Sequence, residues 1–188
     1  MRLKRLACAL LAAVLLLSAV PGAFAAQSGS SFTDITDSSV AEAAEILRLL
    51  GVVNGTGGGA FNPSGTLTRA EFCKMAVEIM GRGDEEPAQR SRTIFQDVGP
   101  KHWARGYVNL ASSITLGGGG DDKSSGERLI MGVGNGKFQP DRAITFGEAV
   151  AILVRILGYS SADIASGDHG YDGYLGIARS SGLLGTLG

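Results

Sequence analysis

Apolar residues recur at helical spacing in four stretches of the chain. They occupy positions i, i+3, i+4 and i+7 within 39–50 and 68–80, and again within 103–114 and 145–157. Each stretch therefore predicts a helix with one apolar face that must be buried. A glycine-rich connector separates the two helices of each pair, so the pattern predicts a mainly α-helical chain of tandem helix–loop–helix units.

The start of the second predicted helix returns 77 residues later. Residues 67–72 (LTRAEF) correspond to 144–149 (ITFGEA). In both copies a threonine precedes a glutamate by three residues, which predicts a capping box at the helix start. The four residues to which we assign this structural role are Thr68, Glu71, Thr145 and Glu148.

The connectors repeat at the same offset. Three glycines, a phenylalanine and a proline of 55–63 return in 132–140, and a Phe-x-Asp sequence precedes each unit at 32–34 and 95–97. We interpret Asp34 and Asp97 as stabilisers of caps or turns. A later stretch resembles the first helix of the second unit, and therefore predicts the beginning of a third unit.

These boundaries divide the chain into parts. We expect a signal peptide at 1–25, a disordered lead at 26–31, a first repeat at 32–82, a linker at 83–94, a second repeat at 95–159 with a polar insertion at 117–127, and the start of a truncated third repeat at 168–188.

The N-terminal segment predicts export. A basic start precedes an apolar run of about 15 residues that is too short to span a bilayer, and no later segment is longer, so we expect no membrane span in the mature chain. Removing residues 1–25 takes away three basic and no acidic residues, which changes the formal charge from −1 to −4. This acidity argues against nucleic acid as a partner. Cys73 would be the one remaining cysteine, on an apolar helix face, and we predict a core residue.

The ordered motifs resemble the S-layer homology (SLH) domain family. The resemblance rests on the Phe-x-Asp starts, on His102-Trp103, on the connectors ending in Phe-x-Pro, and on the Thr-Arg-Ala-Glu entry to the second helix. It implies a pseudo-threefold helical bundle of three repeats, here with the third incomplete. It also implies non-covalent anchoring of an exported protein to the cell wall of a bacterium of Gram-positive type, through a secondary cell-wall polysaccharide that can carry a pyruvate ketal.

Two residues are candidates for glycan contact. Arg69 stands in the first turn of a helix, where the helix dipole favours anions, and its planar fork suits a carboxylate ligand; the alternative is a solvated surface arginine. Trp103 could stack on a sugar or anchor the core. In the second unit Phe146 replaces the arginine, so we expect that pocket to be degenerate or to bind a less acidic group.

Other functions have weaker support in the sequence. There is no set of residues for nucleophilic or zinc catalysis, so we predict no enzyme, no metal site and no cofactor. Two alternatives stay open: a structural surface-layer subunit that self-associates through its incomplete third repeat, and the anchor fragment of a secreted hydrolase whose catalytic domain lies outside this chain.

Overall fold

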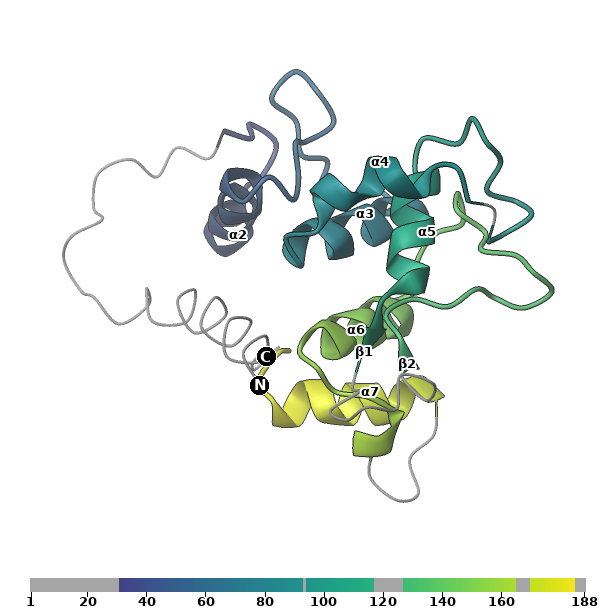
Figure 1. Cartoon of the computed structure of the whole chain (residues 1–188). Helices are drawn as coiled ribbons and strands as arrows, with labels where there is room; N and C mark the ends of the chain where they lie inside the picture. Colours follow the sequence, from purple (N-terminus) through teal and green to yellow (C-terminus); the bar gives the residue numbers. More distant parts are fainter. Residues whose placement is uncertain (1–30, 93, 117–126, 165–169, 185–188) are drawn as a thin grey trace. The chain divides into compact units, whose positions relative to one another are not determined.

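The computed structural model describes residues 31–92, 94–116, 127–164 and 170–184. Helices account for nearly all of its regular structure, which confirms the mainly α class (Figure 1). It divides into two compact units, 1–65 and 66–188. The predicted signal peptide, the lead except Ser31, and residues 117–126 of the predicted insertion lie outside the described residues. The threefold arrangement stays a prediction.

The first unit contains helix α2, Ser38–Leu49. Its N-cap is Asp37, whose side chain accepts hydrogen bonds from the backbone N–H groups of Ser39 and Val40. The sequence also offers Ser38 or Ser39 as a cap for a helix over 39–50, and that prediction is wrong by one or two residues. Asp37 is the better cap because its carboxylate also receives the hydroxyl of Ser39. Gly51 follows the apolar run directly and is therefore predicted to close the helix, and it does so with φ +73°.

The first connector folds back on the start of its unit. The ring of Phe61 packs against that of Phe32, with centroids 5.1 Å apart, and Asp34 accepts the backbone N–H groups of Phe61 and Asn62. Val52 is the buried anchor of this connector, with 3% of its surface exposed. The sequence of this connector predicts Val53, Phe61 and Pro63 as its inward anchors, but Val53 and Phe61 are only partly buried and Pro63 is exposed.

The second unit contains the remaining elements. They are α3 Arg69–Ile79, η2 Gly83–Glu85, α4 Glu86–Gln89, α5 Arg105–Ser113, β1 Thr115–Leu116, β2 Glu127–Arg128, α6 Phe146–Ile156, η3 Ser161–Asp163 and α7 Gly170–Ser180. Strands β1 and β2 pair antiparallel, with Leu116 opposite Glu127. The predicted insertion 117–127 is therefore one residue too long at its end, because Glu127 belongs to β2. Helix α7 lies within 168–188, where the sequence predicts the start of a third repeat.

Capping boxes begin both second helices. Thr68 caps α3 and Thr145 caps α6, and in each the glutamate at the third helical position returns a hydrogen bond to the cap backbone. The shared Thr-x-x-Glu sequence thus gives the same local structure in both repeats.

One hydrophobic core joins α3, α5 and the second connector. On α3 the fully buried residues are Ala70, Cys73, Ala76 and Val77. The apolar spacing within 68–80 predicts a buried face that includes Met75 and Ile79. Ile79 is 36% exposed, because the buried face is rotated toward Cys73 and Val77. Cys73 is completely buried, as predicted, and its Sγ donates to the Tyr107 carbonyl at 3.5 Å.

The predicted linker holds ordered structure. Within 83–92, η2 and α4 pack beside α3 and α5, and Glu86 is only 3% exposed (Figure 1). The Glu86 carboxylate receives Arg90 at 2.7 Å. A Cβ at Gly106 of α5 would stand 2.0 Å from Glu86 Oε1, so the missing side chain permits this close packing. A charged stretch without apolar periodicity folds here because its glutamate is buried with a partner.

The second connector repeats the first. Phe95 and Phe138 lie 5.3 Å apart, and Asp97 accepts the backbone N–H groups of Phe138 and Gln139 at 2.9 and 2.8 Å. Both aspartates therefore stabilise turns, as predicted, but they do so across the whole repeat. A smaller apolar cluster lies between α6 and α7, which run side by side (Figure 1).

Candidate binding pocket

The second unit contains a pocket of about 570 Å³. Its walls come from the second connector, α6, η3 and the first turns of α7, and Arg69 of α3 also lines it. Apolar lining residues are Ile130, Met131, Val133, Ile152 and Ile164. Charged and aromatic lining residues are Arg69, Glu127, Glu148, Arg155, Tyr171 and Tyr174.

Arg69 is held by four interactions inside this unit. Its Nε donates to the Phe138 carbonyl at 2.9 Å, Nη1 to Glu148 at 2.7 Å, and Nη2 to the Met131 carbonyl at 3.0 Å. Its guanidinium carbon lies 4.7 Å from the centre of the Phe138 ring. Arg69 is 3% exposed, so the alternative of a solvated surface arginine is wrong. Burial lowers the pKa of its guanidinium, and the charge of Glu148 opposes that shift.

Glu148 has two tasks at the start of α6. One oxygen completes the capping box with Thr145, and the other receives Arg69 and, at 2.5 Å, Arg142. Burial acts to raise the pKa of this carboxyl. The hydrogen bonds from Arg142 and Thr145 and the charge of Arg69 outweigh burial and hold the pKa below its ordinary value.

A second ion pair also lines the pocket. Arg155 of α6 donates to Glu127 of β2 at 2.5 Å and lies over the ring of Tyr174 on α7. The Tyr174 hydroxyl donates to the same carboxylate, and the backbone N–H of Ser161 donates to its other oxygen at 2.6 Å. The charges of Arg69, Arg155, Glu127 and Glu148 therefore balance around the pocket.

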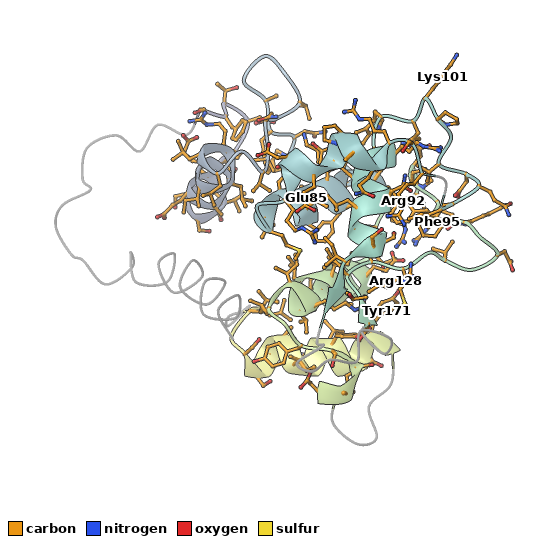
Figure 2. The ribbon with its side chains drawn as sticks, in the orientation of Figure 1. Glu85, Arg92, Phe95, Lys101, Arg128 and Tyr171 are labelled. Carbon is orange, nitrogen blue, oxygen red and sulfur yellow. The ribbon has the colours of Figure 1, made fainter. Side chains whose placement is uncertain are left out.

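Exposed apolar groups stand at the mouth. Tyr171 is 50% exposed, Met131 50% and Val133 41%. Figure 2 labels Tyr171 at the start of α7. A Cβ at Gly147 would lie 3.0 Å from the Cβ of Tyr171, so this glycine lets the tyrosine pack closely on α6. The arrangement offers an aromatic surface beside paired charges, which suits binding of a polar molecule with apolar faces.

The other candidates lie outside the pocket lining. Trp103 is 52% exposed and its ring stacks on His102 at 6.0 Å, so it is not a core anchor. Its contact with glycan stays a prediction. Phe146 is 60% exposed and contributes no lining atom.

Sequence reasoning missed four lining residues: Glu127, Arg155, Tyr171 and Tyr174. The repeat pattern places Glu127 in the predicted insertion 117–127, and it gives no reason to single out the other three. Tyr171 and Tyr174 each follow a glycine in the sequence GYDGYLG at 170–176. Two aromatic residues in so glycine-rich a stretch are the signal that could have identified them. Among the described residues, no three His, Cys, Asp or Glu side chains gather as a metal site would require.

The fold and this pocket define a class: helical repeat proteins in which each connector is packed against its own Phe-x-Asp start. The S-layer homology domain family matches residues 31–73 and 123–150. The chain thus carries S-layer homology domain sequence in both repeats, as its motifs predict.

Similar proteins come from bacterial surfaces. The chain is 31% identical over 157 residues to a surface layer protein of Brevibacillus choshinensis, which covers 84% of this chain and 13% of that protein. It is 32% identical over 184 residues to a cell surface protein of Thermoanaerobacter kivui, covering 97% of this chain and 21% of the relative. A cellulosome-anchoring protein of Acetivibrio thermocellus is 27% identical over 105 residues, 56% of this chain and 21% of that protein.

The chain thus spans about a fifth or less of the length of these curated relatives. No solved structure matches it. None of the helices in the described part of the chain has the length and apolar character needed to cross a membrane.

Proposed function

We propose that this chain anchors an exported protein non-covalently at the bacterial cell surface, by binding a secondary cell-wall polysaccharide in the pocket beside Arg69. The expected setting is the cell wall of a Gram-positive type of bacterium, reached through the predicted signal peptide. The names of the surface-layer and cellulosome-anchoring relatives support a surface role. The proposal involves binding without catalysis.

The observation that carries the proposal is the combination of Tyr171 and Arg69 at one pocket. A half-exposed tyrosine ring can stack on the apolar face of a sugar. Arg69 has five N–H donors, and described residues of the second unit accept three of them, so two are without an acceptor in the described part of the chain and can meet a ligand oxygen. The pocket volume of about 570 Å³ lies within the range of small-molecule sites.

A finer part of the proposal concerns ligand charge. We propose an anionic glycan, which can bear a pyruvate ketal. Because Glu148 already neutralises Arg69, a ketal carboxylate would bind through the remaining N–H groups of the arginine rather than through an unpaired charge. A planar guanidinium suits that geometry and an ammonium does not.

The test is co-sedimentation of the full chain with purified wall sacculi, before and after chemical removal of the non-peptidoglycan polymer. We expect binding only before removal. Tyr171→Ala should weaken binding about tenfold, because it removes a stacking surface worth roughly 1 kcal/mol or more. Tyr159→Ala is the matched control, since Tyr159 is 37% exposed and does not line the pocket.

Ligand charge is tested by competition. A sugar bearing the pyruvate ketal should release the wild-type chain from sacculi more effectively than the same sugar without the ketal. Arg69→Lys, which keeps the charge but loses the fork, should reduce that preference. Binding that survives polymer removal would contradict the glycan proposal, and loss of binding in Trp103→Ala but not Tyr171→Ala would move the site to Trp103.

A further inference from the structure

The two repeats are connected by a joint between the start of α3 and the second connector. Its backbone contacts run antiparallel along the two segments. They are Ile144 N–H to Leu67 O at 3.0 Å, the Thr68–Ala143 bridge, Arg69 N–H to Arg142 O at 2.9 Å, and Ala70 N–H to Pro140 O at 2.9 Å. The first N–H groups of a helix have no partner within the helix, and here the next connector supplies carbonyls for two of them.

One side chain completes this joint. The guanidinium of Arg69 lies over the ring of Phe138 and donates to its carbonyl. Phe138 is 0% exposed as a result of this cover and of its packing against Phe95. The joint therefore has two halves: a helix start with a covering side chain, and a connector with an aromatic ring to be covered.

The first half recurs at the start of α6, where the described residues supply no partner for it. Phe146 occupies the position of Arg69, 77 residues on, and it is 60% exposed. No described residue accepts a hydrogen bond from the backbone N–H of Phe146 or Gly147. The capping box that orients this helix start is the same as in α3.

The second half recurs at the first connector. Phe61 occupies the position of Phe138, and Phe32 packs on it as Phe95 does on Phe138. The following residue has a left-handed backbone in both connectors, with φ +62° at Asn62 and +57° at Gln139. Yet Phe61 is partly exposed, and the carbonyls of Pro63 and Gly65 accept no hydrogen bond from any described residue.

We propose that these two halves meet between copies of this chain: Phe146 of one copy covers Phe61 of a second copy. The offset of 77 residues places Gly65 and Pro63 of the second copy where Arg142 and Pro140 stand in the existing joint. Their carbonyls then accept the N–H groups of Phe146 and Gly147. An aromatic pair replaces the cation–ring contact of the existing joint.

This contact joins two different surfaces of the same chain. It is therefore heterologous, and repeated use of it gives a closed ring or an open row of copies. It does not depend on the pocket or on glycan. The substitution of phenylalanine for arginine in the second repeat thereby acquires a role: an exposed aromatic side chain suits a partner surface better than it suits water.

The first experiment measures association of the full chain by sedimentation velocity at increasing concentration. We expect concentration-dependent assembly, weakened about tenfold or more by Phe146→Ser. Phe146→Arg should retain assembly, because it recreates the covering residue of the existing joint. Leu49→Ser, at a residue 70% exposed on α2, is the control and should assemble as wild type does. A wild-type chain that stays monomeric, or Phe146→Ser that assembles equally well, overturns the proposal.

The second experiment tests the register. The Thr68–Ala143 bridge predicts that Thr145 of one copy faces Thr66 of another. A Thr145→Cys chain mixed with a Thr66→Cys chain should give a disulfide-linked heterodimer under oxidation, and either chain alone should give much less. Absence of the mixed product overturns the proposal, as does a double variant that forms this disulfide only within single chains.

Discussion

At the scale of residues, the second unit depends on Arg69. Arg69→Ala removes one partner of a buried ion pair and leaves the carbonyls of Met131 and Phe138 without their donor. Because an uncompensated buried charge is costly, we expect the free energy of unfolding to fall by about 3 kcal/mol, measured by urea titration. Arg142 still contacts Glu148 and limits the loss.

A matched arginine shows what an exposed pair contributes. Arg82 bonds to Glu85 at 2.5 Å, but both side chains are at least a third exposed. Arg82→Ala should therefore cost less than about 1 kcal/mol. If Arg69→Ala and Arg82→Ala lowered the free energy of unfolding equally, burial of the Arg69 ion pair would make no extra contribution to stability.

The contacts of Arg69 could not be predicted from the sequence, whereas those of the neighbouring capping residues could. The capping motif predicted the roles of Thr68 and Glu71, because both partners lie within four residues of each other. The partners of Arg69 are 62 to 79 residues away. Only the folded repeat brings Glu148 beside it, so the sequence left this arginine without a structural reason.

At the scale of elements, the second connector depends on a glycine in close contact with an aromatic ring. A Cβ at Gly132 would lie 2.5 Å from the Phe95 ring and 2.6 Å from the Lys137 carbonyl. Gly132→Ala should therefore force the connector to shift and cost about 1–3 kcal/mol of unfolding free energy. Thermal denaturation followed by circular dichroism measures this as a lower melting temperature.

Gly99→Ala is the control for that measurement, because nothing lies within 4 Å of a Cβ built at Gly99. The first repeat makes the same prediction independently. A Cβ at Gly55 would stand 2.6 Å from the Phe32 ring. If alanine at Gly132 were tolerated as well as at Gly99, the close ring contact would not constrain the connector.

The helices were predictable to within two residues at most ends because their apolar spacing and capping motifs are local. The ordered segment 83–92 was not, since Glu86 is buried through a pair with Arg90 and through the absence of a side chain at Gly106. Neither the Glu86–Arg90 pair nor the close packing at Gly106 produces a periodic pattern of apolar residues in the sequence. The pocket was likewise missed, because its walls come from segments that are distant in sequence.

At the scale of the whole molecule, acid should destabilise both repeats. The N–H groups of Phe61 and Asn62 lower the pKa of Asp34. Burial acts to raise the pKa values of Asp97, Glu127 and Glu148, but hydrogen bonds to each carboxylate outweigh it and lower them. These groups contribute full stability above their ordinary pKa values of 3.8 and 4.5, and lose it as pH falls through the lower folded values.

Urea titrations at a series of pH values test this expectation. The free energy of unfolding should be constant near neutral pH and fall below about pH 4.5. Asp97→Asn should lower the free energy of unfolding at neutral pH by about 2 kcal/mol, because a charged acceptor of two N–H groups is lost. In this variant the free energy of unfolding should also fall less steeply as the pH drops below about 4.5. Asp84→Asn, at an exposed aspartate, is the control. If the free energy of unfolding fell with pH as steeply in Asp97→Asn as in the wild type, Asp97 would not contribute to the acid dependence.

Burial of Cys73 determines how reactive its thiol is toward oxidants and alkylating agents. Burial raises its pKa to about 12, so almost none of it is thiolate at neutral pH, and the thiolate is the form that oxidants and alkylating agents attack. The fold thus shields this sulfur chemically as well as sterically. The rate at which Cys73 is alkylated therefore reports how often the core around α3 opens, because the reagent can reach the thiol only in molecules whose core has unfolded.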